Sequence, residues 1–389
     1  MLTPGEAAAL DDDSPKESPK EPAEEPPEES PGGSSQELPA EPSEVRVAPG
    51  WPGEIRLDPP RDVPPTRRGP LRAAAALLAV LLAAGAVAVW RSGVLAPPCA
   101  DPLTVRVVAH PEIAPALREV AERYTLAENR VRDRCVRVQV VDGTEPGKAD
   151  AWVPESSIWL GRARAAGLAE VPPMAPQIAV TPVVLAVPQR VAAELRRAGG
   201  EPGWRLLRDG RAGKVALSRR VLDPARHATG AIAMLALDQT GEAGGKLVGD
   251  LRRGTPATPT ALLAGLTGPG RPLLVTTEQA VVAHNRAHPE RPAAALLPAE
   301  GTLTLDHPFA VLARDPLRRE AIAAFEPALR GKPARDALQQ AGFRPPDGRF
   351  AEGYAARHGL SAEPPALLRF PTQAQLDRAI KAWTDVSGS

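Results

Sequence analysis

One uncharged apolar run constrains this chain more than any other feature of its sequence. The segment from Ala73 to Trp90 reads AAAALLAVLLAAGAVAVW and holds eighteen residues. An α-helix needs roughly 20 apolar residues to cross a bilayer core of about 30 Å. A cleavable signal peptide lies within about the first 30 residues, so a run that starts at position 73 is typical of a retained anchor. We therefore predict a transmembrane helix over residues 71–91, with a buried core helix as the alternative.

The charges on either side of this run indicate how it is oriented. Basic residues accumulate before it, whereas a single one follows it closely: Arg61, Arg67, Arg68 and Arg72 precede it and Arg91 comes after it. Loops rich in Lys and Arg stay on the cytoplasmic side of a membrane. We therefore predict a single-pass protein of the plasma membrane, with a cytoplasmic N-terminus and an extracytoplasmic main domain.

Residues 1–70 are rich in Pro, Glu, Ser and Gly and carry 16 acidic against 7 basic residues. Such a composition cannot bury enough apolar surface to offset the entropy of the chain. We predict that this segment is a disordered, acidic, Pro-rich cytoplasmic tail.

The remainder of the chain has the opposite charge, because residues 71–389 hold 31 acidic and 40 basic residues. A positive domain attracts anionic ligands or polymers over long distances. The excess of Arg, together with abundant Ala, Pro and Gly, is also what a biased genomic base composition produces. The charge therefore favours an anionic ligand without excluding that background explanation.

The chain contains two cysteines, Cys99 and Cys135, and both fall on the predicted outer side, where a disulfide persists. They precede two apolar runs that we expect to be neighbouring parallel strands, which would bring the thiols together. We predict a bond between them. Lipid attachment at Cys99 is disfavoured because Pro97 and Pro98 precede it rather than small residues, and no zinc-type CxxC spacing exists.

Beyond residue 101, apolar runs alternate with amphipathic stretches, which favours an α/β domain with mostly parallel strands. Nearly 290 residues are enough for two lobes. We expect strands over 103–109, 136–141, 150–153, 178–187, 215–217 and 272–275, helices over 111–124, 191–197 and 376–383, and helices that open after 154–157, 223–230 and 276–278.

Several of these helices open directly after a strand. Unpaired N–H groups and the helix dipole make a helix N-terminus receptive to carboxylate or phosphate. Ligands of open α/β sheets bind at the carboxyl ends of strands, where these loops fall. Ordinary capping, for example by Ser156 or Ser157, explains each loop separately. Several of them around one cleft would form a binding site.

The order of these segments resembles that of type II periplasmic binding proteins, the bacterial extracellular solute-binding domains of membrane-anchored proteins. The resemblance covers residues 103–350 and rests on VRVVAHPEIAPALREVAERY (105–124), ADAWVPESSIWL (149–160), TPVVLAVP (181–188), DPARHATGAIAMLAL (223–237), TTEQAVVAHN (276–285) and GFRPPDG (342–348). It implies two lobes joined by hinge strands, which cross near Thr181 and return near Asp306, and a cleft that closes around a ligand.

This resemblance also implies domain limits and a set of ligand contacts. The solute-binding domain would span 96–370, with lobe I at about 101–180 and 306–370, lobe II at about 182–305, and a C-terminal helix and end at 371–389. The implied contacts are His110, Glu112, Glu155, Ser156, Ser157, Thr181, Ala228, Thr229, Gly230, Thr276, Thr277 and Glu278. Small-oxyanion binders of this class use serines and backbone amides, whereas the first loop here carries His110 and Pro111, so the ligand stays open.

The last five residues, Asp385 to Ser389 (DVSGS), resemble the DxSxS opening of the metal site in von Willebrand factor A domains. Solute-binding and von Willebrand factor A domains occur joined in one architecture, so such a domain and a transporter are candidate partners. The residues before the motif are predicted to form a helix rather than a buried strand, and the later metal ligands of that site are absent. We therefore predict no bound metal and no cofactor.

Three functions follow from these observations. The first is capture of a small ligand in an interlobe cleft by a membrane-anchored solute-binding protein. The second is a surface interaction or adhesion module that keeps the fold without a working pocket. The third is an envelope enzyme. The sequence contains no GxSxG elbow, no HExxH motif and no P-loop, so we predict no enzymatic activity. His284 and His288 have metal-ligand spacing but no third ligand, and the scarcity of aromatic residues disfavours nucleic-acid binding.

Overall fold

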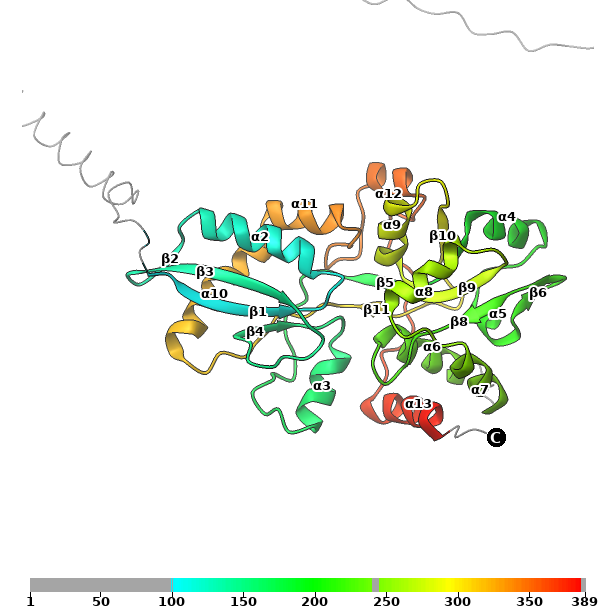
Figure 1. The fold of residues 1–389 in the computed structure, drawn as a ribbon, viewed down its shortest axis with the longest axis horizontal. Helices are drawn as coiled ribbons and strands as arrows, with labels where there is room; N and C mark the ends of the chain where they lie inside the picture. Colours follow the sequence, from blue (N-terminus) through cyan, green and yellow to red (C-terminus); the bar gives the residue numbers. More distant parts are fainter. Residues whose placement is uncertain (1–98, 100, 240–244, 386–389) are drawn as a thin grey trace, which may run out of the picture. The chain divides into compact units, whose positions relative to one another are not determined.

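A computed structural model describes residues 99, 101–239 and 245–385 (Figure 1). The predicted tail, the predicted transmembrane helix over 71–91 and residues 386–389 of the DxSxS motif lie outside these ranges. Among the described residues, no helix combines the length and the apolar character needed to span a membrane.

The first sheet has five strands in the order β12-β4-β1-β3-β2. Its three central strands are parallel, and the two outer strands run antiparallel to their neighbours. The helices that pack with this sheet are α2, α3, α10 and α11 (Figure 1). The bounds are β1 Leu103–Ala109, α2 Ala114–Leu126, β2 Arg130–Val131, β3 Arg134–Asp142, β4 Ala151–Val153, α3 Ile158–Ala165, β12 Ala310–Val311, α10 Pro316–Arg330 and α11 Lys332–Gln340.

The core of this sheet follows from the alternation of side chains along β1. Val105, Val107 and Ala109 share one apolar cluster with helices α2, α10 and α11. Val108 lies in a separate cluster with Trp152 of β4 and with α3. Because successive strand residues point to opposite faces, a continuous apolar strand requires helices on both sides.

The second sheet has the order β10-β5-β9-β8, and the short strand β11 also pairs with β5. Helices α4 to α9 and the C-terminal helices α12 and α13 are drawn around it (Figure 1). The bounds are β5 Thr181–Pro188, α4 Gln189–Arg197, α5 Trp204–Asp209, β8 Ser218–Arg220, α6 Ala228–Gln239, α7 Gly245–Arg253, α8 Pro259–Ala264, η1 Gly265–Thr267, β9 Pro272–Thr277, α9 Glu278–Ala287, β10 Ala293–Leu296, β11 Thr304–Leu305, α12 Glu352–His358 and α13 Gln373–Asp385, with a separate hairpin of β6 Arg211–Ala212 and β7 Val215–Ala216.

Strand β5 also separates two apolar clusters by alternation. Val183, Leu185 and Val187 pack with α6 and α13, whereas Val184 and Ala186 pack with α8 and α9. The predicted C-terminal helix is confirmed as α13, and its buried residues Leu376, Ala379, Ile380 and Trp383 recur at helical spacing. Residues that the implied limits placed after the solute-binding domain of 96–370 therefore pack into the core of the second sheet.

Two short stretches of chain connect the sheets. The first leads into β5, and the second returns through β11, which pairs antiparallel with the start of β5 through Thr181 and Leu305. Gln177 and Pro308 form a further antiparallel bridge. Pro182 therefore lies at the crossover, which is compatible with its missing N–H. The crossing points match those implied by the resemblance, although the exact limits of the lobes stay a prediction.

Two expectations about the strands were wrong. The second sheet is mixed rather than mostly parallel. The chain reaches β5 from the first sheet, and β5 runs antiparallel to both β9 and β10. The strand expected at 215–217 is only the end of a small hairpin, and the sheet strand is β8, three residues further on. A short apolar run does not by itself reveal which of two adjacent segments enters a sheet.

The disulfide between Cys99 and Cys135 is present. Leu103 of β1 and Val136 of β3 are paired in parallel register, so the two cysteines meet just ahead of neighbouring strands. The bond closes a loop with a sequence separation of 36 residues.

We expect loss of this disulfide to lower the free energy of unfolding by about 3 to 4 kcal/mol, because the open chain gains conformational entropy. Urea denaturation of the full chain with and without reductant measures the difference. The variant Cys99→Ser serves as the control and should unfold at the same urea concentration in both conditions. Equal midpoints for the wild-type protein would contradict the expectation.

Candidate functional site

The candidate site begins where two parallel strands of the first sheet end. Ala109 and Val153 are paired at the carboxyl ends of β1 and β4, and the backbone N–H of His110 donates to the carbonyl of Val153 at 2.8 Å. This register places two predicted site residues side by side. Nε2 of His110 lies 3.8 Å from Oε2 of Glu155, and both side chains are about 94% buried.

Glu155 connects this point to the second sheet. Its Oε1 accepts hydrogen bonds from the backbone N–H of Ala228 at 2.7 Å and from the indole N–H of Trp159 at 2.9 Å. Ala228 is the first residue of α6. A carboxylate at a helix N-terminus is favoured by the helix dipole. The start of α6, which the sequence suggested as a ligand site, is therefore occupied by a side chain of the chain itself.

The start of α3 is arranged in the same way. Oδ1 of Asp306 accepts a hydrogen bond from the backbone N–H of Ser157 at 2.8 Å and one from the hydroxyl of Ser156 at 3.1 Å. Asp306 lies on the returning connection between the sheets. The predicted contacts Ser156 and Ser157 thus bind a carboxylate that belongs to the hinge region.

The start of α9 is satisfied by two threonine hydroxyls. Oγ1 of Thr181 accepts from the N–H of Gln279, and Oγ1 of Thr277 accepts from the N–H of Ala280, both at 3.0 Å. Thr276 is buried in β9, on the strand that pairs with β5. These predicted site residues therefore hold the helix and the hinge strand together in the structure.

Glu278 forms an ion pair with Arg344, a residue that the sequence analysis did not single out. The guanidinium donates from Nε to Oε1 at 2.7 Å and from Nη2 to Oε2 at 2.8 Å, and both side chains are almost fully buried. Burial raises the pKa of Glu278, whereas Arg344 lowers it. Each carboxylate oxygen of Glu278 already accepts one hydrogen bond from Arg344, and its contact with a ligand stays a prediction.

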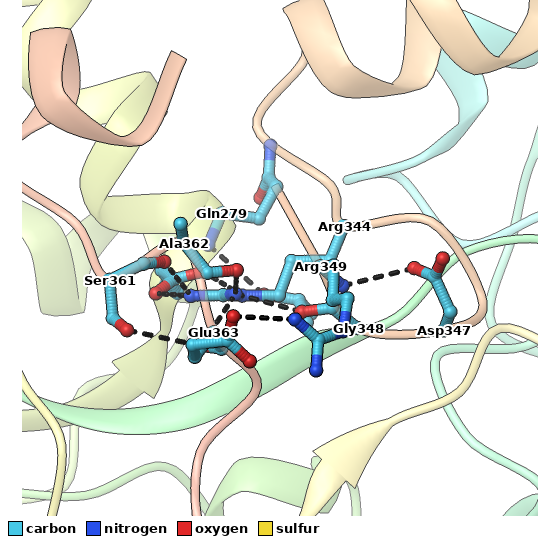
Figure 2. A network of polar contacts seen from close by, with 10 residues as sticks. Gln279, Arg344, Asp347, Gly348, Arg349, Ser361, Ala362 and Glu363 are labelled. Carbon is cyan, nitrogen blue, oxygen red and sulfur yellow. Dashed lines mark hydrogen bonds and ion pairs between the residues drawn. The ribbon is translucent and has the colours of Figure 1, made fainter. Parts of the chain in front are cut away.

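Arg344 also gathers the C-terminal segments of the domain (Figure 2). Its guanidinium donates to the carbonyls of Gly348 at 2.8 Å and Ser361 at 2.9 Å, and it stacks 4.4 Å from the ring centroid of Phe350. Its backbone bridges to Val180 on the crossing segment. A single buried cation thus connects α9, the hinge strand and the loops before and after α12.

We expect Arg344→Met to lower the free energy of unfolding by about 3 to 5 kcal/mol, because it leaves the carboxylate of Glu278 buried without a partner. Adding Glu278→Gln should recover part of the loss. Urea denaturation measures both effects. Arg349→Met, which removes an exposed pair with Glu363, is the matched control and should cost less than about 1 kcal/mol. Equal losses for the two arginine variants would contradict the prediction.

Gly230 has a packing role. A Cβ atom built on it would lie 2.2 Å from the carbonyl oxygen of Leu222 and 2.9 Å from the nitrogen of Pro224. The loop before α6 therefore packs directly against the backbone of the first helical turn. This contact explains the glycine without a ligand, so its predicted role in binding stays untested.

Two histidines complete the polar cluster and were not in the predicted set. His307, beside Asp306, is fully buried, and its ring centroid lies 6.5 Å from that of His110. His227 immediately precedes α6 and interacts electrostatically with Glu155 and His110. The sequence contained a signal for each, because His227 lies inside the quoted segment 223–237 and His307 follows the predicted return point.

Burial controls the charges in this cluster. It lowers the pKa of His307 to about 3 and also lowers the pKa of His110, so both rings are neutral near pH 7. Burial raises the pKa of Glu112, and so does the nearby Glu155, while His110 opposes the shift. Burial likewise raises the pKa of Glu155, and its bond from Ala228 opposes this. Within the described ranges, no three His, Cys, Asp or Glu residues are arranged to hold a metal ion.

We expect the neutral ring of His307 to make stability depend on pH. Its pKa is about 6.5 in the unfolded chain and about 3 in the folded one, so its stabilising contribution is complete above pH 6.5 and is lost as the pH falls. Between pH 6.5 and 4 the wild-type protein should lose about 2 to 3 kcal/mol more than His307→Gln. Urea denaturation across this range measures the difference. The control His288→Gln, at a half-exposed position, should follow the wild type. Parallel curves for wild type and His307→Gln would contradict the assignment.

Comparisons with known proteins identify the fold. A solved periplasmic thiamin-binding protein superposes with a TM-score of 0.54 at 13% identity, over 74% of this chain and 97% of its own. The periplasmic binding protein P5PA superposes with a TM-score of 0.50 at 14% identity, over 73% and 99%. These likenesses define a two-lobed type II periplasmic-binding-protein fold and confirm the predicted α/β architecture.

The sequence comparison names the family. Residues 105–344 match the family described as bacterial extracellular solute-binding protein, which is more than half of the chain. The chain therefore belongs to the bacterial extracellular solute-binding protein family. It is also 30% identical over 157 residues to an uncharacterised protein of Mycobacterium tuberculosis, in a match that covers 34% of this chain and 23% of that protein. The match thus spans only about a quarter of that relative's length.

Proposed function

We propose that this domain captures a small ligand between its two lobes and closes around it by bending at the two connecting segments. The observation that carries the proposal is the meeting of buried polar side chains from both sheets. His110 and Glu155 come from the ends of β1 and β4, and Thr229 comes from the first turn of α6. Nδ1 of His110 and Oγ1 of Thr229 are buried and have no hydrogen-bond partner among the described residues.

Such atoms are informative because burying a polar group without a partner costs about 1 to 3 kcal/mol. A ligand that supplies the missing partners would recover that free energy on binding. The bond from Ala228 to Glu155 joins the lobes directly, so the described arrangement is a closed one. Ligand entry then requires the lobes to separate at the segments around Thr181 and Leu305, which is the hinge motion typical of this fold.

The proposal includes the position of the domain in the cell. The family is extracellular by its description, and the apolar run over 71–91 supports a single transmembrane anchor with a cytoplasmic N-terminal tail. We propose that the domain presents its ligand to a membrane partner, such as a transporter, and that it catalyses no reaction.

We expect a concentration-dependent rise in the thermal unfolding temperature of the full chain with one class of a panel of amino acids, oxyanions, sugars, polyamines and metal ions. At a hundredfold excess over Kd the stabilisation is about 2.7 kcal/mol, which corresponds to roughly 5 °C. Thr229→Ala should weaken the response, because it removes an unpartnered hydroxyl of the site. Thr384→Ala, at the exposed end of α13, is the control. An unchanged unfolding temperature with every compound of the panel would contradict the proposal.

A second function is favoured by a different observation. The side chains of Met174 and Phe370 are 83% and 55% exposed, and both line a groove of about 380 Å³. A groove bordered by two exposed apolar side chains offers a contact surface for another protein. If the closed cluster admits no ligand, an interaction module with this groove as its contact surface is the remaining candidate. The substitution Met174→Ser would then weaken partner binding, and it should leave the ligand response unchanged.

A further inference from the structure

Several donors that would bind an anion in this site already have acceptors within the chain. The N–H of Ala228 at the start of α6 donates to Glu155, and the donors at the start of α3 are directed at Asp306. At the start of α9, the hydroxyls of Thr181 and Thr277 accept from the N–H groups of Gln279 and Ala280. An anionic ligand would compete with a carboxylate at both α3 and α6. Because each carboxylate is covalently part of the chain, that competition occurs at high effective concentration.

Polar atoms from four residues of the cluster have no hydrogen-bond partner in the described part of the chain. They are Nδ1 of His110, both ring nitrogens of His307, Oε2 of Glu112 and Oγ1 of Thr229. The residues His110 and Thr229 are each only 5% exposed, so water does not replace the missing partner freely. An ionised carboxylate of Glu112 can only accept, and the hydroxyl of Thr229 and the neutral ring of His110 can accept as well, so a group that donates several hydrogen bonds can satisfy all three.

The charges of the side chains in the cluster also bear on which ligand it favours. Glu112 and Glu155 interact electrostatically with each other, and the neighbouring rings of His110 and His307 are neutral when buried. The buried cation Arg344 is already paired with Glu278, the first residue of α9. Arg226, which is exposed, interacts electrostatically with His227 of the cluster. Among the residues that the structure describes, neither Glu112 nor Glu155 forms an ion pair with Lys or Arg, which favours a positively charged ligand.

We propose that the ligand of this domain is an organic cation with several N–H donors, an alkylammonium or guanidinium group, rather than an oxyanion. The cationic group lies between Glu112 and Glu155 and donates to Oε2 of Glu112, to the ring nitrogen of His110 and to the hydroxyl of Thr229. This inference rests on the proposed function, and it reverses the ligand charge that the net positive domain suggested. The surface charge is spread over the domain, whereas the charge of the site is set by two carboxylates.

Isothermal titration calorimetry of the full chain with matched probes tests this assignment. The probes are methylguanidinium, ethylammonium and 1,4-diaminobutane, then tetramethylammonium as a cation without donors, then sulfate, phosphate and succinate, and finally neutral sugars. We expect saturable binding of at least one cation with donors, and at least tenfold weaker binding by Glu112→Gln and by Thr229→Ala. The control is Glu119→Gln, which makes the same change on the exposed face of α2, where Glu119 pairs with Arg123, and should leave binding unchanged.

A measurement on the wild-type protein keeps the test independent of the variants. A cation that lowers the pKa of Glu112 and Glu155 displaces protons, so titration near pH 5.5 in buffers of different ionisation enthalpy should show proton release. Proton uptake, or tighter binding of sulfate, phosphate or succinate than of every cation, would overturn the inference and leave the proposed function standing. Binding of the cations with unchanged affinity in Glu112→Gln would also overturn it. If no probe binds, the proposed function itself fails.

Discussion

A single buried charge, the guanidinium of Arg344, holds the parts of this domain in register. Its ion pair with Glu278 holds the start of α9, and its backbone bridges to Val180 just before β5. Its bonds to Gly348 and Ser361 gather the C-terminal loops (Figure 2). A desolvated arginine is tolerated only when nearly all of its donors are satisfied. The segments that satisfy it are therefore held together around one side chain, and the segment that leads into β5 contacts this residue beside the site.

The same principle, internal satisfaction of polar groups, explains why the site differs from a simple oxyanion site. Helix N-termini attract anions whatever their source. In this chain the carboxylates of Glu155 and Asp306 accept hydrogen bonds from N–H groups at the starts of α6 and α3. The chain itself therefore supplies an anion at each of these two helix ends. What remains is a set of buried polar atoms without partners among the described residues, Nδ1 of His110 and Oγ1 of Thr229 among them.

Much of the fold could be predicted because it depends on local periodicity. The run from Leu103 to Ala109 is confirmed as β1, the helix before the C-terminal end is confirmed as α13, and the cysteine pair follows from the position of two strand starts. The site could be predicted only as a neighbourhood. Strand-to-helix loops point to the right edge of the sheets, but nothing in the sequence separates Thr229, whose hydroxyl is unpartnered, from Thr277, whose hydroxyl caps a helix.

The sequence by itself therefore determined the alternation of strands and helices and the disulfide, because each depends on neighbours along the chain or on a fixed strand register. The crossing points near Thr181 and Asp306 came from the resemblance to a known family. Only the tertiary structure decided which polar groups face each other. Glu155 meets Ala228 across 73 positions, and Arg344 meets Glu278 across 66. Pairings of this kind depend on how two separately folded sheets approach, and the free energy of a buried charge depends on the partners that this approach supplies. No local pattern contains that information.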